Sequence, residues 1–466
     1  MDTKRRLTYL MIALYFFLSG VEYAVILPTM WLYIHENFGA TSAFLGLMLS
    51  AFSISDLFCS PIYGRISDKY RCTKYLVIFS NLWEIGGNIM YFMGISLPFL
   101  LCSRFVTGVG AGAGAAIVSD IARATNVRER TGVIAILMAC RQVGLVIGPG
   151  CNLFLRLVNT SIGPYPLTAY SVPGLFMASL WLLHTLLSLC LYTDFHRMAP
   201  PDDGDGDDER RRLVADGDGV GYEAVAAAAP EPEPPALVTD RRYYVNEYLR
   251  HELVAILATI FATFFNQTAL EAMLTPLTKD YLGWGELGNS LLYLGAGVEV
   301  ILVFMVVRCA SSRFYDSSLI LLGSAVSAAA IAGMLVYFPL AVPGNELNLP
   351  MLIGSVFLDV IALPFLVTCS VSLYSKITSP ATQGFSQGLR RSVIGLSTIM
   401  GPLWAGSMLT RLSIMLAVLL SLILLMMALF CLSMPRLRCY EKAADSERRL
   451  SKTDEAAESG PETVNA

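Results

Sequence analysis

Two arginines stand inside stretches that are otherwise apolar enough for lipid. Arg104 begins SRFVTGVGAGAGAAIVSD (residues 103–120), and Arg141 lies within ERTGVIAILMACRQVGLVIGP (residues 129–149). A lone charge in hydrocarbon costs several kcal/mol, so each guanidinium needs an acid, carbonyl groups or water inside a bundle. Buried cations of this kind can bind anions or support proton transfer. The alternative for Arg104 is snorkelling, because it lies about 9 Å from one end of its predicted helix.

Carboxyl groups at comparable depth are the candidate partners of these arginines. Glu22 and Glu271 occupy matching places in EYAVILP and EAMLTP, each shortly before a proline that we expect to close its helix. Ionisable groups at such depth usually mark a pathway, and burial favours the protonated form that proton coupling uses. The alternative for each acid is a structural counter-ion. The expected substrate- or ion-binding residues are Arg104, Arg141, Glu22, Glu271, Glu299 and Asp359. Glu84 is a further deep acid, and Asp56 lies nearer the cytosol.

Membrane-spanning helices must position these residues. The chain has 466 residues, of which 55% are hydrophobic and 15% charged, whereas soluble domains carry about a quarter charged residues. Apolar runs of roughly 20 residues, the length that spans a bilayer, begin near residues 7, 42, 75, 97, 132 and 171, and again near 253, 287, 317, 350, 384 and 413. The sequence therefore predicts an all-α membrane protein with twelve transmembrane helices in two six-helix pseudo-repeats.

Basic residues gather in one set of predicted loops, which by the positive-inside rule places both termini in the cytosol. We expect residues 1–194 to form an N-terminal six-helix bundle and residues 251–435 a C-terminal one. Residues 195–250, with PPDDGDGDDERRR and AAAAPEPEPP, are too polar to fold alone and lack the spacing of a calcium loop. They predict a disordered cytosolic linker, and residues 436–466 predict a disordered cytosolic tail.

GRISDKYRCTK, residues 64–74, lies between the second and third predicted helices. It resembles the signature of the major facilitator superfamily, Gly-x-x-x-Asp-Arg/Lys-x-Gly-Arg-Arg/Lys, although Arg71 stands where the second glycine is expected. Gly64 would let two helices meet closely, and Asp68 would bond the positive end of a neighbouring helix. Such a bond acts as a latch that must break when the halves move; the alternative is a merely basic turn. The expected latch residues are Gly64, Asp68, Lys69, Asp120 and Arg123.

Two further stretches resemble patterns of the same family. Residues 104–110 match Arg-x-x-x-Gly-x-Gly of the fourth helix, and residues 144–149 match Gly-x-x-x-Gly-Pro of the fifth. Small residues let helices approach closely. We therefore expect helix packing at Gly108, Gly112, Gly144, Gly148 and Pro149.

Residues 265–304, with Glu271, Thr275-Pro276-Leu277-Thr278, Trp284 and Gly297-Val298-Glu299, are similar to an endolysosomal branch of this family associated with neuronal ceroid lipofuscinosis. The resemblance implies a multi-pass protein of lysosomal or endosomal membranes, with the plasma membrane as the alternative. It also implies chloride conductance as a candidate activity. Asn159, in a sequon of a predicted non-cytosolic loop, is a candidate glycosylation site.

Together these features predict a secondary transporter of a small anionic solute that works by alternating access, with protons as the candidate coupling ion. The alternatives are an endolysosomal chloride channel on the same scaffold and a non-transporting membrane receptor or scaffold. The sequence shows no nucleophile–base constellation, metal-ligand spacing or phosphate loop, so we expect no enzyme, no cofactor and no metal. The expected partners are membrane lipid and a small-molecule or ion substrate, with no nucleic acid, and the expected state is a monomer.

Overall fold

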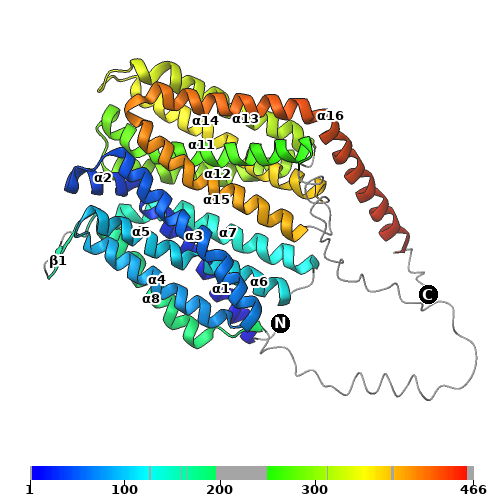
Figure 1. The fold of residues 1–466 in the computed structure, drawn as a ribbon, viewed down its shortest axis with the longest axis horizontal. Coiled ribbons are helices and arrows are strands. Elements are labelled where there is room, and N and C mark those ends of the chain that lie inside the picture. Colours follow the sequence, from blue (N-terminus) through cyan, green and yellow to red (C-terminus); the bar gives the residue numbers. More distant parts are fainter. Residues whose placement is uncertain are drawn as a thin grey trace, which may run out of the picture.

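The computed structural model describes residues 3–124, 127–158, 160–163, 165–195, 249–311, 313–378 and 383–458. Within these ranges the chain forms two groups of long helices that lie side by side, an N-terminal bundle and a C-terminal bundle (Figure 1). The start of α1 and the end of α16 lie at the same end of the molecule. Residues 196–248, nearly all of the predicted linker, and Asn159 lie outside the described residues.

The N-terminal bundle is built from α1 (Thr3–Val25), α2 (Leu27–Phe38), α3 (Ser42–Tyr70), α4 (Thr73–Met93), α5 (Leu97–Ala111), α6 (Ala113–Ala124), α7 (Val127–Leu155) and α8 (Val172–Leu191). Two strands, β1 (Thr160–Ile162) and β2 (Tyr165–Leu167), pair antiparallel between α7 and α8. We call the end of the molecule that carries these strands and Phe38 the outer end.

The C-terminal bundle is built from α11 (His251–Leu282), α12 (Glu286–Ala310), α13 (Asp316–Tyr337), α14 (Asn348–Ile377), α15 (Gln383–Met408) and α16 (Leu412–Glu458), with short 3-10 turns η2 (Phe338–Leu340) and η4 (Leu409–Arg411). In the described chain, ten stretches are long and apolar enough to cross a membrane, and the last one, Gly388–Lys442, contains parts of both α15 and α16. The all-α membrane fold is confirmed. The number of twelve spans and the cytosolic termini stay predictions.

The two prolines that we expect to close helices differ: α1 ends at Val25, shortly before Pro28, whereas α11 continues past Pro276, which corrects the second expectation. The chain resumes as α2 one residue after α1, with Pro28 in its first turn, where the missing N–H of proline costs no helical bond. Pro276 lies inside α11, which continues for six more residues to Leu282. Neighbouring helices can compensate the lost backbone bond inside a membrane bundle.

The chain after residue 435 is not the disordered tail that the sequence predicts, because α16 continues to Glu458. Glu441 is buried and accepts hydrogen bonds from the backbone nitrogen and Oγ of Ser317, at 3.0 and 2.6 Å, which ties α16 to the first turn of α13. Arg436 pairs with Glu252 of α11 at 3.0 Å. Among residues 436–442, whose side chains the structure describes, all but Leu437 and Glu441 are exposed, so the polar composition predicted their exposure but not the loss of helix.

Glycines bring α7 against α1. A Cβ atom on Gly20 would collide with the carbonyl group of Arg141, and one on Gly144 would collide with the carbonyl oxygen of Phe17. A Cβ on Gly148 would lie 2.8 Å from the carbonyl oxygen of Val21. These glycines let the two backbones approach closely, as small residues do in membrane bundles.

The same kind of contact joins α5 and its neighbour α3. A Cβ atom on Gly108 would collide with the carbonyl oxygen of Phe52, and one on Gly112 would lie 2.9 Å from the ring of Tyr63. Gly64 differs from both, because no described atom lies within 4 Å of a Cβ placed there. The predicted close approach at Gly64 is therefore absent among the described residues.

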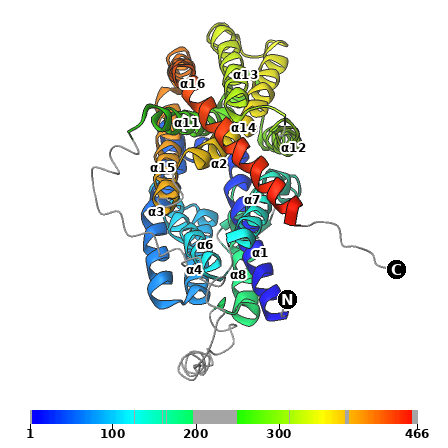
Figure 2. The ribbon, with the colours of Figure 1, turned by 90° about the vertical axis from the view of Figure 1, so that its right-hand side faces the viewer.

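The most extensive contacts between the two bundles lie along two pairs of helices. Figure 2 shows α3 beside α15 on one side of the molecule and α7 beside α12 on the other. Ser42 and Ser50 of α3 donate hydrogen bonds to backbone oxygens of α15, Gly406 at 2.9 Å and Ile399 at 2.7 Å. On the other side, Val146 of α7 packs against Gly297 of α12.

Candidate functional site

A carboxylate of the C-terminal bundle is held by the N-terminal bundle. The Tyr23 hydroxyl, on α1, donates a hydrogen bond of 2.8 Å to Oε2 of Glu271, on α11. Gln267, one turn before Glu271 on the same helix, donates from Nε2 to Oε1 at 2.9 Å. Each carboxylate oxygen therefore has its own donor. The Tyr23–Glu271 bond must break if the bundles are to separate at this depth.

Arg141 brings a positive charge to the same region. It lies at the midpoint of α7, fourteen residues from Val127 and fourteen from Leu155, and its charge acts on Glu271, Tyr23 and Asp56. Its side chain is partly exposed. Among the residues that the structure describes, it makes no ion pair. A guanidinium in this position is available to an anion between the bundles.

A second group of charges is sealed inside the N-terminal bundle. Glu22 of α1 is only 2% exposed and accepts hydrogen bonds from Asn88 Nδ2 and Trp181 Nε1, both at 2.7 Å. The carboxyl group of Glu84, on α4, lies against that of Glu22. Both oxygens of Glu22 thus face neutral donors from α4 and α8, and the site is closed by its own bundle.

Arg104 belongs to this sealed group. It is 1% exposed, its guanidinium carbon lies 5.1 Å from the centre of the Phe52 ring, and its charge acts on Glu84. The snorkelling interpretation is therefore wrong, because the side chain stays inside the bundle. Arg104 and Glu22, two of the expected substrate- or ion-binding residues, therefore lie in a different group from Arg141. Buried in their own bundle, they cannot touch a solute between the bundles without rearrangement.

The remaining two predicted acids lie apart from both groups. Asp359 of α14 accepts a hydrogen bond of 2.6 Å from Ser327 of α13 and lines a small cavity inside the C-terminal bundle. Glu299 of α12 is partly buried, and its Oε2 has no hydrogen-bond partner among the described residues. The structure thus brings Glu271 together with Arg141 and Glu22 together with Arg104, and leaves Asp359 and Glu299 separate.

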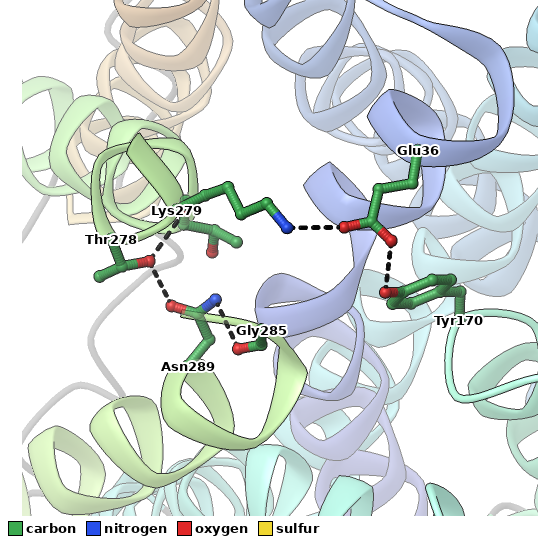
Figure 3. Close-up of polar contacts among 7 residues, drawn as sticks. Glu36, Tyr170, Thr278, Lys279, Gly285 and Asn289 are labelled. Carbon is green, nitrogen blue, oxygen red and sulfur yellow. Dashed lines mark hydrogen bonds and ion pairs between the residues drawn. The ribbon is translucent and has the colours of Figure 1, made fainter. Parts of the chain in front are cut away.

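Polar contacts also close the outer end between the bundles (Figure 3). Glu36 at the end of α2 accepts hydrogen bonds from Lys279 of α11 at 2.8 Å and from Tyr170 at 2.7 Å. The hydrogen bond from Lys279 is the main reason that the pKa of the Glu36 carboxyl lies below its usual value. Thr278 bonds Asn289 of α12 at 2.6 Å, which holds the end of α11 to the next helix.

The hydrogen bonds that join described residues of the two bundles all lie in the outer half of the molecule. They are the bonds Tyr23–Glu271, Leu27–Thr275, Glu36–Lys279, Ser42–Gly406 and Ser50–Ile399. The described part of the chain is therefore tied together at its outer end. Such one-sided closure is the arrangement expected when one half rocks against the other about a fixed site.

Comparison with known proteins agrees with this architecture. Residues 12–347 match the family model described as Major Facilitator Superfamily. The chain belongs to this superfamily. Its fold is that of a membrane transporter, and the predicted family is confirmed.

Two curated relatives are similar to this chain over only part of their lengths. Major facilitator superfamily domain-containing protein 8 of Xenopus laevis is 24% identical over 326 residues, which are 66% of this chain and 59% of that protein. The quinolone resistance protein NorA of Staphylococcus aureus is 25% identical over 187 residues, 39% of this chain and 44% of that protein. The chain therefore matches about three fifths of the first relative and less than half of the second.

Solved structures of other transporters share the fold. A bacterial homologue of the human lysosomal transporter Spinster, in an inward-facing and unoccupied conformation, superposes with a TM-score of 0.69 at 13% identity, covering 95% of this chain and 99% of that one. A D-xylose–proton symporter gives 0.66 at 13% identity, covering 92% and 97%. The human organic anion transporter MFSD10 gives 0.56 at 17% identity, covering 92% and 100%. At these identities the likeness shows the fold alone.

The superfamily signature, which begins within the last turns of α3, is described only in part. Arg71, at the place of the second signature glycine, has a φ of 49° and ends α3 by donating its N–H to the carbonyl of Ser67 at 2.9 Å. Glycine adopts this left-handed conformation without steric cost, which explains why the family uses it there. Asp120 is buried and Lys69 is exposed, but the side chains of Asp68 and Arg123 lie outside the described residues. The latch stays a prediction.

Sequence reasoning missed several residues of these sites. Tyr23 and Gln267, which hold Glu271, could have been suspected, since one follows Glu22 directly and the other lies one helical turn from Glu271. The sequence did not indicate the role of Trp181 as a donor to Glu22, because tryptophan is a common residue in apolar helices. Glu36 was missed because an acid at a helix end is usually solvated.

Proposed function

We propose that this member of the superfamily is a secondary transporter that moves a small anionic solute by alternating access, with Arg141 as the cation that binds the solute. The observation that carries the proposal is the place of Arg141, halfway along α7 and beside the contact between the bundles. Transporters of this architecture bind substrate near the bilayer midplane, at the interface of their repeats. A partly exposed guanidinium there can attract and orient an anion.

The coupling part of the proposal concerns Glu271. Its carboxylate is held by Tyr23 from the opposite bundle and by Gln267 from its own helix. When the bundles separate, Tyr23 leaves and Glu271 loses one donor, which favours uptake of a proton in its place. Arg141 acts against this uptake while no anion is bound. Solute binding and protonation of Glu271 therefore support each other.

The compartment is a further part of the proposal. The likeness of residues 265–304 to an endolysosomal branch of the family supports placement in the lysosomal or endosomal membrane. The relative that is 24% identical supports the same branch, although only 59% of its length is matched. Localisation of the tagged full chain with markers of each membrane tests this part, and staining of the plasma membrane alone contradicts it.

Uptake by purified protein tests the central claim. The full chain is reconstituted into lipid vesicles and offered a panel of labelled organic anions and chloride, with and without a pH gradient. We expect saturable uptake of at least one anion, which a pH gradient accelerates. Arg141→Gln should abolish uptake, and Arg141→Lys should retain part of it, because the charge remains while the planar fork is lost.

An exposed arginine provides the matched control for this experiment. Arg411→Gln removes the same charge from an exposed position of η4 and should leave uptake unchanged. Normal uptake by Arg141→Gln would overturn the role of that residue. Non-saturating chloride current through the reconstituted protein, without counter-ion stoichiometry, would instead favour a channel on the same scaffold.

A further inference from the structure

A small cavity lies inside the C-terminal bundle, between α11, α13, α14 and α16. Its volume is about 30 Å³, and its polar wall consists of oxygen-bearing side chains: Thr259, Thr263, Asn266, Gln267, Ser324, Ser327 and Asp359. The rest of the wall is largely aliphatic. A space of roughly 10–15 Å³ holds one water molecule. The cavity therefore has room for a single small ion or for water.

The hydroxyl groups of this wall have their protons engaged elsewhere. Thr259 donates to the carbonyl oxygen of Ala255 and Thr263 to that of Thr259, both at 2.8 Å. Ser324 donates to the carbonyl oxygen of Ile320 at 2.8 Å. A hydroxyl has one proton and two lone pairs. Each of these groups can therefore offer the cavity only an acceptor.

The amide and the carboxylate add to this excess of acceptors. Asn266 is 3% exposed, and its amide nitrogen donates to the carbonyl oxygen of Leu419, whereas its Oδ1 is buried without a hydrogen-bond partner among the described residues. An unsatisfied buried acceptor costs about 1–3 kcal/mol. Asp359 receives one side-chain donor, Ser327, at 2.6 Å. The wall thus presents a carboxylate and neutral oxygen lone pairs.

We propose that this cavity binds a sodium ion. Hard cations prefer carboxylate, carbonyl and hydroxyl oxygens, which are the groups that face the cavity. One carboxylate balances one positive charge, so a monovalent ion leaves the buried site neutral. The small volume favours a dehydrated sodium ion over a larger cation. Binding would also satisfy Oδ1 of Asn266, which otherwise has no partner.

Gln267 connects this site to the contact between the bundles. It lines the same cavity, and its Nε2 donates to Glu271, which Tyr23 holds from α1. A sodium ion that orders the wall of the cavity therefore also orders the side chain that positions Glu271. This connection rests on the proposed transport function, whereas the binding site itself does not.

Direct binding of radioactive sodium to the purified full chain tests the site. We expect saturable binding that potassium and choline do not compete for at equal concentration. Asp359→Asn and Thr263→Val each remove an oxygen ligand at nearly constant volume, and each should weaken binding roughly tenfold or more. Asp280→Asn makes the same chemical change at an exposed position of α11 and should bind sodium as the unchanged chain does.

A thermal measurement gives a second readout. The unfolding temperature of the unchanged chain should rise in sodium chloride relative to choline chloride of equal ionic strength, because a ligand that binds only the folded state stabilises it. The rise should vanish in Asp359→Asn. If that variant fails to fold, Thr263→Val and Ser327→Ala decide the question through the same two measurements.

Absence of saturable sodium binding, or equal binding by Asp359→Asn, would overturn the site and leave a water-filled cavity. Binding is measured without any transported solute, so its failure differs from a failure of the transport proposal. Saturable sodium binding by a chain that transports nothing overturns transport alone. Uptake that is indifferent to sodium, in a chain that binds it, overturns the connection through Gln267.

Discussion

The two bundles bury acidic side chains in different ways. The N-terminal bundle holds Glu22 and Glu84 and supplies its own guanidinium, Arg104, to the same sealed interior. The C-terminal bundle holds Asp359 with one hydroxyl donor and neutral oxygens, and no arginine or lysine lines that cavity among the described residues. The first interior contains one guanidinium for two carboxyl groups, so the chain itself supplies a cation for one ionised carboxylate. The second is left with an excess of negative charge.

This difference separates structural charges from exchangeable ones. A carboxylate whose partners are side chains of its own bundle keeps those partners throughout a cycle in which bundles move as units. A carboxylate that lacks a fixed cation responds to ions from solution. Glu22 and Glu271 occupy matching positions in the two halves of the sequence but differ in environment. Glu22 is hydrogen-bonded within its own bundle, whereas Glu271 is hydrogen-bonded to the opposite bundle.

Removal of Arg104 should give the largest loss of stability. Arg104→Gln leaves the carboxyl groups of Glu22 and Glu84 buried without their cation, which should lower the free energy of unfolding by about 3–5 kcal/mol. Denaturant unfolding of the purified chain measures this. Arg141→Gln is the control, because that partly exposed guanidinium should contribute little to folding. Equal free energies of unfolding for the two variants would contradict the difference between the bundles. The double variant Arg104→Gln with Glu84→Gln should regain part of the lost stability, which would identify Glu84 as a carboxyl group that Arg104 compensates.

A smaller loss is expected at Glu22. Glu22→Gln keeps the shape but replaces one acceptor oxygen with an amide nitrogen, which then faces a donor from Asn88 or Trp181. One buried hydrogen bond is lost and a clash of donors arises, so the free energy of unfolding should fall by about 1–3 kcal/mol. Sodium in the buffer should not change this value. A sodium-dependent loss would show that the N-terminal bundle also binds the ion.

The corresponding change in the C-terminal bundle should have the opposite sign. In sodium-free buffer, Asp359→Asn removes a buried charge that has no fixed cation, so the free energy of unfolding should stay equal or rise by roughly 1 kcal/mol. In sodium chloride the free energy of unfolding of the unchanged chain should exceed that of Asp359→Asn. Unfolding of both proteins in the two salts gives the result. A loss in sodium-free buffer as large as that at Glu22 would remove the distinction between the bundles.

The smallest effect is expected at the outer contact. Both Glu36 and Lys279 are 36% exposed, so Glu36→Gln should favour opening of the outer end by less than about 1 kcal/mol. Because the Lys279 hydrogen bond lowers the pKa of Glu36, its contribution is present above the usual carboxyl pKa. It is lost only as the pH falls through the lowered value.

Distance distributions between spin labels at the exposed outer residues Asn37 and Glu346 measure this opening. The separation should lengthen for Glu36→Gln at neutral pH and, in the unchanged chain, only in more acidic solution than an ordinary glutamate requires. Opening of the unchanged chain near neutral pH would show that another group controls the contact.

Helix packing was largely predictable from the sequence. Gly144 and Gly148 face α1 because small residues at a spacing of four lie on one face of a helix, whatever surrounds them. The membrane fold followed from apolar runs for the same reason. Gly64 was misjudged because the expectation rested on its place in a motif, whereas no described atom lies within 4 Å of a Cβ placed there.

The grouping of the charges could not be predicted. A helix can be placed in the membrane from its composition, but its rotation is set by packing against its neighbours. That rotation decides whether Arg104 meets Glu84 and whether Glu271 meets Tyr23. The tail was misjudged for a related reason, because its polarity excluded burial in lipid but not a helix tied down at Glu441.

The hydrogen bonds of Glu441 attach α16 to the first turn of α13, so the part of α16 beyond this point moves with the C-terminal bundle. When that bundle tilts about its outer contacts, the end of α16 lies farthest from the pivot and travels the greatest distance (Figure 1). A dye attached there would report each swing of the protein from the aqueous side, without touching the route that the solute takes.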